Sequence, residues 1–155
     1  MTSGRPPEVG SAGPAFTLRS QHGEAVAPVG AGRPVLLVFF PFAFSPICSS
    51  ELSELQECLP AFTRAGVDVV AIACDSVYSL RAMADREELS LMLVSDFWPH
   101  GAVARAYGCF DEDSGAAGRS SFLLDAAGVV RWSLHHGVGE QRPVAAHLGA
   151  LPRLS

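Results

Sequence analysis

The sequence predicts an α/β fold in which a mixed central β-sheet is flanked by helices. Three observations lead to this fold class. Short runs of apolar, β-favouring residues alternate along the chain with longer stretches in which apolar residues recur at helical spacing. Two apolar runs near the C-terminus are separated by Ala126-Ala-Gly128, which indicates a hairpin. The chain has 155 residues, enough for a full core, and we expect residues 1–155 to form a single domain.

The N-terminal part predicts a mobile segment, a small hairpin and the first core strand. Residues 1–13 are rich in Gly, Pro and Ser, and we expect them to be mobile. Residues 16–18 and 25–27 have the pattern of two short strands joined by a turn. The run Val35-Leu-Leu-Val-Phe-Phe40 is apolar throughout and is ended by Pro41, which predicts a buried strand.

A long helix follows this strand. Residues 45–65 carry apolar side chains at helical spacing, and Gly66 is placed to end the helix. The order of the predicted elements, strand–helix–strand–helix with a hairpin and a final helix, is typical of a thioredoxin-like fold. The remaining predicted elements are a strand at 67–73, a helix at 76–89, a strand at 91–94, a helix at 101–107, strands at 121–125 and 129–134, and a helix at 140–150.

Composition excludes several classes of protein. The net charge of −5 and the lack of a basic run argue against nonspecific binding to nucleic acid. No apolar run approaches the ~20 residues that a membrane-spanning helix needs. The start of the sequence lacks the apolar segment of a secretory signal, so we expect a cytoplasmic protein without a membrane partner.

Cys48 is the most informative residue of the chain. It lies a few residues beyond the strand at 35–40, in the predicted first turn of the helix at 45–65. Unpaired backbone N–H groups and the positive end of the helix dipole favour the thiolate there, and the thiolate is the nucleophilic form. The alternative is a buried cysteine that acts only as a small apolar residue.

The residues around Cys48 resemble a known signature. Pro41-x-x-x-Ser45-x-x-Cys48 is similar to the Pro-x-x-x-Thr/Ser-x-x-Cys signature of peroxiredoxins, which are thiol peroxidases with a thioredoxin-like fold. The resemblance is to the one-cysteine, alkyl hydroperoxide reductase E branch, and it extends in one register over residues 35–51, 95–101, 106–108 and 119–125.

The resemblance implies an activity and its partners. It implies an antioxidant enzyme that reduces hydrogen peroxide, organic hydroperoxides and peroxynitrite through a cysteine sulfenic acid. An external thiol, either a low-molecular-weight thiol or a mycoredoxin- or thioredoxin-like protein, would reduce that sulfenic acid. The resemblance implies a homodimer and no metal, haem or flavin. Phe40, Phe42, Phe44 and Ile47 suggest an apolar entry that suits alkyl hydroperoxides.

The resemblance also implies four site residues. Cys48 attacks the peroxide, Ser45 hydrogen-bonds it, Pro41 shields the sulfur from water, and the family's arginine falls on Arg119. A fixed cation beside Cys48 stabilises the thiolate and the departing oxygen. Without the resemblance, Arg119 is better interpreted as a surface arginine. Glu51 has two open interpretations, an ion pair with Arg119 or a favourable first-turn acid.

The other cysteines decide how the sulfenic acid is reduced. Cys58 lies ten residues beyond Cys48 in the same predicted helix, ~15 Å away, beyond the ~7 Å limit of a disulfide. Cys74 ends a buried strand and is expected to be core. Cys109 follows Tyr107-Gly108 in a predicted loop and is expected to be the most accessible, so a resolving role for it stays open, with Cys58 as the weaker candidate.

Two further classes of function remain open. A thiol–disulfide oxidoreductase shares the fold and the helix-start cysteine, but the sequence has no C-x-x-C, which also argues against a zinc site. A peroxide-sensing redox protein would use the same sulfenic acid as a signal. Adjacent His135 and His136 point to opposite faces of a strand and would not share a metal.

Overall fold

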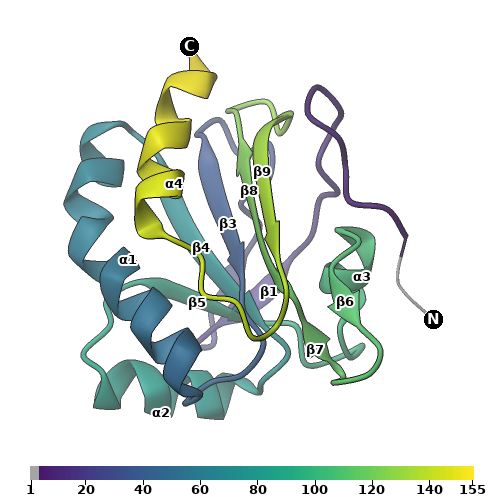
Figure 1. Cartoon of the computed structure of the whole chain (residues 1–155), viewed down its shortest axis with the longest axis vertical. Helices are drawn as coiled ribbons and strands as arrows, with labels where there is room; N and C mark the ends of the chain where they lie inside the picture. The colour runs from purple at the N-terminus through teal and green to yellow at the C-terminus, as the bar shows by residue number, and fades with distance from the viewer. Residues whose placement is uncertain (1–3) are drawn as a thin grey trace.

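Seven strands form one mixed sheet at the centre of the molecule, with helices packed on both sides (Figure 1). This arrangement comes from a computed structural model, which describes residues 4–155. Two further short strands form a separate small sheet. The elements follow one another as β1 (Leu18–Ser20), β2 (Ala25–Val26), β3 (Val35–Phe39), α1 (Pro46–Arg64), β4 (Asp68–Ala73), α2 (Val77–Arg86), β5 (Met92–Ser95), α3 (Ala102–Ala106), β6 (Phe110–Asp111), β7 (Ala116–Ala117), β8 (Arg119–Leu124), β9 (Val130–His136), α4 (Val144–Ala150) and the 3-10 helix η1 (Leu151–Leu154).

The central sheet is parallel in its middle and antiparallel toward its edges. Its strand order is β2-β1-β5-β4-β3-β8-β9. β3, β4 and β5 pair in parallel, and α1 and α2 form the crossovers between them. β8 pairs antiparallel with β3, β9 with β8, and β1 with β5. A mixed sheet flanked by helices confirms the predicted fold class.

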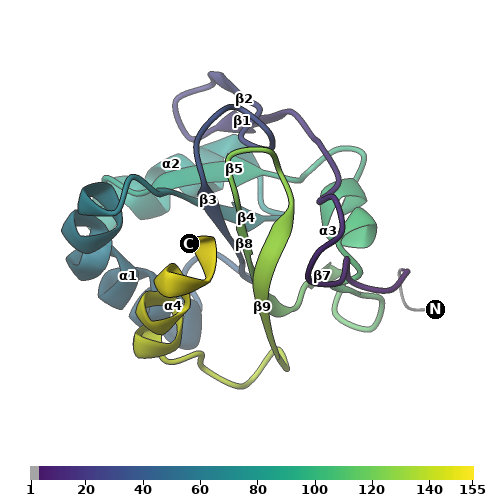
Figure 2. The same cartoon turned by 90° about the horizontal axis from the view of Figure 1, so that it is seen from above.

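Alternate residues of β3 face two different apolar clusters. Leu36 and Val38 pack in the cluster under α1, α2 and α4, whereas Leu37 and Phe39 pack in the cluster under α3. Figure 2 shows α1 and α4 on one side of the sheet and α3 on the other. Because strand side chains alternate between the faces, a continuous apolar run is what a strand covered on both sides requires. Both clusters share this one sheet, and we propose that the chain forms a single domain.

The helix ends differ from the prediction in informative ways. Ser45 caps α1, which begins at Pro46, and Gly66 follows its end with a φ of 74°. The last helix begins at Val144 instead of residue 140, because Pro143 restricts the residue before it and the Arg142 N–H is bonded to a side chain instead of a helix carbonyl. None of the helices in residues 4–155 is long and apolar enough to cross a membrane.

The C-terminal hairpin is longer than predicted. β8 and β9 pair from Arg119 opposite His136 to Leu124 opposite Val130, so at the end away from the turn they extend past the expected ranges of 121–125 and 129–134 by two residues each. The added residues, Arg119, Ser120, His135 and His136, are polar, so the apolar pattern of the sequence does not predict them as part of a strand. Likewise, β6 and β7 have two residues each, too few for any periodicity to predict.

The segment expected to be mobile makes backbone contacts. Gly10 N–H donates to the Val130 carbonyl at 2.8 Å, and Gly13 N–H donates to the Gly128 carbonyl at 2.8 Å. These bonds attach residues 10–13 to the β8–β9 hairpin. Residues 1–3, part of the same expectation, lie outside the described residues, and the mobility of residues 1–13 stays a prediction.

His147 is a buried histidine at the contact between α4 and the sheet. Only 4% of it is exposed, and its Nε2 lies 2.8 Å from the Ser121 Oγ. The Trp132 ring packs against it with ring centroids 5.6 Å apart. Burial lowers the pKa of His147 to about 4, and the nearby Arg142 charge acts in the same direction. The folded protein therefore keeps this imidazole neutral.

We predict that His147 makes the protein less stable as the pH falls below about 6.5. The unfolded chain protonates this histidine near its ordinary pKa, whereas the folded protein resists protonation until about pH 4, so the unfolded state binds more protons between these values. The contribution of His147 to the free energy of unfolding should fall by about 2 kcal/mol from pH 7 to pH 5. Urea unfolding at both pH values measures this loss, which His147→Leu should remove. An equal loss in His147→Leu and wild type would contradict the assignment.

Candidate active site

Cys48 lies in the first turn of α1, as the sequence predicts. Ser45 is the N-cap, and its Oγ accepts a hydrogen bond from the Cys48 backbone N–H at 3.4 Å. Pro46 is the first helical residue, where its missing N–H costs no hydrogen bond. The Cys48 side chain is fully buried and packs in the cluster under α1 with Phe40 and Leu52. Its thiol therefore meets the positive end of a helix in a site shielded from bulk water.

The loop between β3 and α1 is held at the end of the neighbouring strand. Asp75, which follows β4, accepts a hydrogen bond from the Ala43 N–H at 3.0 Å. Phe44 has a φ of 68°, which is uncommon for a residue with a side chain. Pro41 is buried at the start of this loop. Such local strain persists only where the surroundings fix the backbone, and these contacts fix the approach to Ser45 and Cys48.

Arg119 and Glu51 form a buried ion pair, which is the first of the two interpretations of Glu51. Arg119 Nη1 donates to Glu51 Oε1 at 2.6 Å, and Arg119 Nε donates to the Val138 carbonyl at 2.7 Å. The β3–β8 register pairs Val38 with Ser121, so its continuation sets Arg119 level with Phe40, where the chain leaves β3 for the loop. Arg119 is therefore a buried residue at the same end of the sheet as Cys48 and not a surface arginine.

Arg142 is a second buried arginine at this site, and the sequence interpretation missed it. It bonds to Glu51 through its backbone N–H at 2.6 Å, its Nε at 3.0 Å and its Nη2 at 2.9 Å. Its Nη1 donates to the Ser120 carbonyl at 2.9 Å and to the Ser121 Oγ at 3.0 Å. In the sequence, Arg142 stands in a polar stretch before a proline, and nothing local distinguishes it from a surface arginine.

Glu51 joins two guanidinium groups with one carboxylate. It accepts four hydrogen bonds, three from Arg142 and one from Arg119. Burial alone would raise the pKa of Glu51, but the hydrogen bonds and charge of Arg142, with the charge of Arg119, hold that pKa below its ordinary value. No other carboxylate of residues 4–155 pairs with either arginine. The cluster therefore carries one net positive charge, one helical turn from Cys48.

The other cysteines are poorly placed for reaction with Cys48. All four cysteines of the chain are free thiols. Cys58 lies ten residues along α1 from Cys48, and it is half-buried against the core. At the rise of a helix the two are ~15 Å apart, which a disulfide cannot span without unwinding the helix.

Cys109 is not the accessible thiol that we expected. It is buried with Tyr107 and Phe110 in the cluster on the far face of the sheet from Cys48. Burial raises the pKa of Cys109, and the charge of Asp96 raises it further. The same two causes raise the pKa of Cys74 to about 12. Both thiols stay protonated at neutral pH, so neither is activated for attack.

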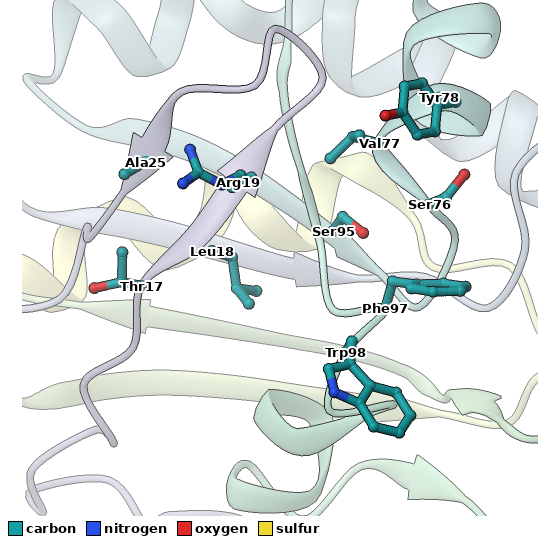
Figure 3. Close-up of a pocket in the computed structure, with 10 residues that line it drawn as sticks. All are labelled: Thr17, Leu18, Arg19, Ala25, Ser76, Val77, Tyr78, Ser95, Phe97 and Trp98. Atoms are coloured by element: carbon teal, nitrogen blue, oxygen red, sulfur yellow. The ribbon is translucent and has the colours of Figure 1, made fainter.

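Aromatic side chains gather beside the site, at the carboxyl ends of the parallel strands. Phe97 and Trp98 are exposed, and with Tyr78 they line a cavity of about 470 Å³. Figure 3 shows the residues of β1 and β2 on one side of this cavity and the segments 76–78 and 97–98 on the other. A second cavity of about 260 Å³ reaches the loop after β3 and is lined by Pro41, Phe42, Cys74, Asp75, Ser76, Ser79, Phe97, His100, Gly115 and Ala116.

The expected apolar entry needs one correction. Phe40 is fully buried in the core under α1, so it cannot line an entry. Its position follows from the alternation along β3, which turns it to the same face as Leu36 and Val38. Phe42 and Phe44 are about two-fifths exposed and do lie at the surface. Residues 4–155 contain no group of three or more His, Cys, Asp or Glu side chains placed to hold a metal ion.

Comparisons with known proteins agree with this geometry. The model of the AhpC/TSA family matches residues 9–133. Alkyl hydroperoxide reductase E of Mycobacterium tuberculosis is 39% identical over 149 residues, which cover 95% of this chain and 97% of that protein. Peroxiredoxin 2 of Thermoplasma acidophilum is 31% identical over 134 residues, 83% of this chain and 66% of that protein.

Solved structures resemble the whole architecture. The reduced 2-Cys peroxiredoxin of Plasmodium vivax superimposes with a TM-score of 0.84 at 25% identity, covering 95% of this chain and 81% of that one. A peroxiredoxin-like protein from Aquifex aeolicus has a TM-score of 0.88 over all of this chain and 92% of that one, and at 18% identity it supports the fold alone. From the family match and these relatives, we conclude that the chain belongs to the AhpC/TSA family and is a peroxiredoxin, a thiol peroxidase similar to alkyl hydroperoxide reductase E.

Proposed function

We propose that Cys48 is the peroxidatic cysteine of this thiol peroxidase. The observation that carries the proposal is the position of its thiol in the first turn of α1, one turn before a buried cluster with a net positive charge. A buried excess of positive charge is costly unless an anion balances it. The Cys48 thiolate is the anion that the site supplies, so the cluster favours the nucleophilic form of the sulfur.

The reaction balances with this one sulfur. The Cys48 thiolate attacks the terminal oxygen of a hydroperoxide, an S–O bond forms and the O–O bond breaks. The sulfur is oxidised to a sulfenic acid, and the peroxide is reduced to an alkoxide that takes up a proton and leaves as the alcohol. Negative charge therefore moves from the sulfur to the leaving oxygen, and fixed donors around that oxygen lower the barrier.

Arg119, Ser45 and Pro41 have separate roles in the proposal. Arg119 bonds to described residues through Nε and Nη1 only, which leaves donors for the peroxide and its leaving oxygen. The Ser45 Oγ caps α1 beside Cys48 and presents its hydroxyl to the peroxide. Pro41 is buried and has no N–H, so it shields the sulfur from water without adding a donor.

Glu51 and Arg142 act behind Arg119. Glu51 fixes the Arg119 guanidinium from the buried side, which leaves the rest of that group free to face the substrate. Arg142 supplies three of the four hydrogen bonds to Glu51 and so compensates most of its charge. Without Arg142, the Glu51 carboxylate would neutralise Arg119. The guanidinium would then stabilise the thiolate and the leaving oxygen less.

The substrates that we propose are hydrogen peroxide, organic hydroperoxides and peroxynitrite. The name of the relative in Mycobacterium tuberculosis points to alkyl hydroperoxides. Phe42 and Phe44 give the loop before Cys48 an exposed apolar surface that suits an alkyl group. We expect faster reaction with a long-chain hydroperoxide than with hydrogen peroxide.

We propose that an external thiol recycles the enzyme. The Cys48 sulfenic acid condenses with this thiol to give a mixed disulfide and water, and a second thiol then releases the Cys48 thiol. The buried, unactivated Cys74 and Cys109 and the distance of Cys58 support an outside reductant over an internal one. The reductant would be a low-molecular-weight thiol or a mycoredoxin- or thioredoxin-like protein of the cytoplasm.

We also propose a homodimer that covers the aromatic surface beside the site. Five of the six large exposed apolar side chains in residues 4–155 follow the carboxyl ends of β3, β4 and β5: Phe42, Phe44, Tyr78, Phe97 and Trp98. Exposed apolar patches of this kind commonly mark protein interfaces, and aromatic residues are enriched there.

Replacement of the sulfur tests the proposed function. We predict that Cys48→Ser reduces peroxide consumption with a thiol donor to the uncatalysed background, because the attacking sulfur is removed and burial keeps Cys74 and Cys109 protonated. Cys58→Ser, which changes a thiol on the same helix, should retain wild-type activity. Peroxidase activity in Cys48→Ser would overturn the proposal.

The mass of the oxidised wild type, in the same experiment, separates the two modes of recycling. Treatment with one equivalent of peroxide should add one oxygen atom, and a small thiol should then form a mixed disulfide at Cys48. A loss of two hydrogens, with a peptide map that joins Cys48 to Cys58, Cys74 or Cys109, would instead identify an internal partner.

A charge placed on the aromatic surface tests the dimer. We predict that Trp98→Glu dissociates the protein, because a carboxylate buried in an apolar interface loses its hydration. Val9→Glu, which changes the sixth exposed apolar side chain far from this surface, should leave the dimer intact. Sedimentation equilibrium gives the masses, and a monomeric wild type or an unchanged Trp98→Glu dimer would contradict the proposal.

A further inference from the structure

A line of buried polar contacts connects Arg142, which is bonded to Glu51, to the C-terminal helix α4. Arg142 Nη1 donates to the Ser121 Oγ at 3.0 Å, and the same oxygen lies 2.8 Å from the His147 Nε2. Ser121 is on β8 and His147 is on α4, and both are buried. The contacts therefore join α4 to Glu51 on α1 through one hydroxyl and one guanidinium.

The chemistry of Arg142, Ser121 and His147 indicates which group donates each hydrogen bond in this line. A guanidinium only donates, so the Ser121 oxygen accepts from Arg142 and keeps its own O–H to give. The neutral imidazole of His147 offers an acceptor nitrogen at hydrogen-bond distance. We assign Nε2 as the acceptor, with the proton of the neutral imidazole on Nδ1, so that the O–H of Ser121 points to His147 and a lone pair of its oxygen stays aimed at Arg142.

We propose that Ser121 and His147 are positioning residues of the peroxidase site, which hold Arg142 against Glu51 and thereby keep Arg119 free to act on the peroxide. This inference rests on the proposed function, since it assigns a role around the Cys48 site. Neither side chain touches the reacting atoms.

The proposal follows from how the bonds of Arg142 are shared. Its Nη1 is held from the side of β8 by Ser120 and Ser121, while its Nε and Nη2 hold Glu51. A guanidinium is planar and rigid, so loosening one edge tilts the other. If Arg142 loses its hydrogen bond to Ser121, its hydrogen bonds to Glu51 weaken. Glu51 then neutralises more of the Arg119 charge.

The surroundings of His147 suit a neutral, fixed acceptor. The charged and titratable groups that face it are Arg142 before α4, Glu51 on α1 and His136 on β9. A protonated His147 would donate to the Ser121 oxygen and set a second cation against Arg142 across one hydroxyl. The Trp132 ring holds the imidazole edge-on from β9, which limits its rotation.

The chain contains a chemically matched pair that lacks this connection. Ser120 Oγ lies 2.9 Å from the Nδ1 of His135, which stands opposite it on β9. Adjacent strand residues point to opposite faces, so the Ser120 side chain lies on the face away from α1 and its hydroxyl has no bond to Arg142. The Ser120–His135 pair therefore controls for the loss of a serine–histidine contact as such.

The test compares wild type with variants of these residues. The quantity measured is the second-order rate constant for oxidation of reduced Cys48 by hydrogen peroxide, by stopped-flow at pH 7.5. Ser121→Ala and His147→Leu should each lower it about fivefold, the effect of one lost neutral hydrogen bond. The double variant should lose no more than either single one, since both remove the same support. His147→Gln, whose amide oxygen accepts from Ser121, should recover most of the rate, and Ser120→Ala and His135→Leu should react like wild type.

Three results would decide against the inference. Unchanged rates in Ser121→Ala and His147→Leu, equal losses in the Ser120 and His135 variants, or no recovery in His147→Gln would each overturn it. Urea unfolding checks that each variant is folded. If His147→Leu does not fold, the rate constant of Ser121→Ala decides the question. Cys48→Ser separates the two proposals. If this variant keeps peroxidase activity, the proposed function is wrong. If Cys48→Ser is inactive and Ser121→Ala is fully active, only this inference is wrong.

Discussion

Glu51 is a buried carboxylate that holds two guanidinium groups, and the arrangement of the candidate active site depends on it. Its four hydrogen bonds join α1, β8 and the segment before α4 at one point. Removing one partner of a buried ion pair leaves an uncompensated charge, at a cost of roughly 3–5 kcal/mol. This constraint fixes the position of α1 on the sheet and sets the first turn of that helix, with Cys48, beside a net positive charge.

The alternation of side chains along β8 distributes these roles. Arg119 and Ser121 point to the face covered by α1 and α4, whereas Ser120 and Phe122 point to the other face. One strand therefore supplies the cation of the site, the hydroxyl that supports Arg142 and the core of the opposite layer. The same alternation on β3 buries Phe40 next to Cys48. The site combines three distant chain segments because the end of β3 lies beside the start of the antiparallel strand β8, and Glu51 bonds the segment before α4 to the same place.

Local patterns predicted the parts of the site that lie close together in sequence. The apolar run of β3, its end at Pro41 and the helical spacing after Cys48 are readable without a structure, whereas the capping role of Ser45 was found only in the structure. Arg119 came only from the resemblance to peroxiredoxins, and its ion pair with Glu51 was one of two open interpretations. Arg142 and His147 could not be predicted, because their burial arises from contacts with residues 91 and 26 positions away. Cys109 was misjudged for the same reason, since the cluster that buries it includes residues of β3 and β4, which lie far from it in the sequence.

In the proposed reaction, Arg119 is the cation that acts on the peroxide. The most direct measurement is the second-order rate constant for reduced Arg119→Gln with hydrogen peroxide, beside Arg131→Gln, which removes an exposed arginine of β9 paired with Asp125. We expect a fall of about 100-fold or more for Arg119→Gln, the usual loss when one charge-stabilising donor is removed, and none for Arg131→Gln. A folded Arg119→Gln whose rate constant stays within about twofold of wild type would contradict it.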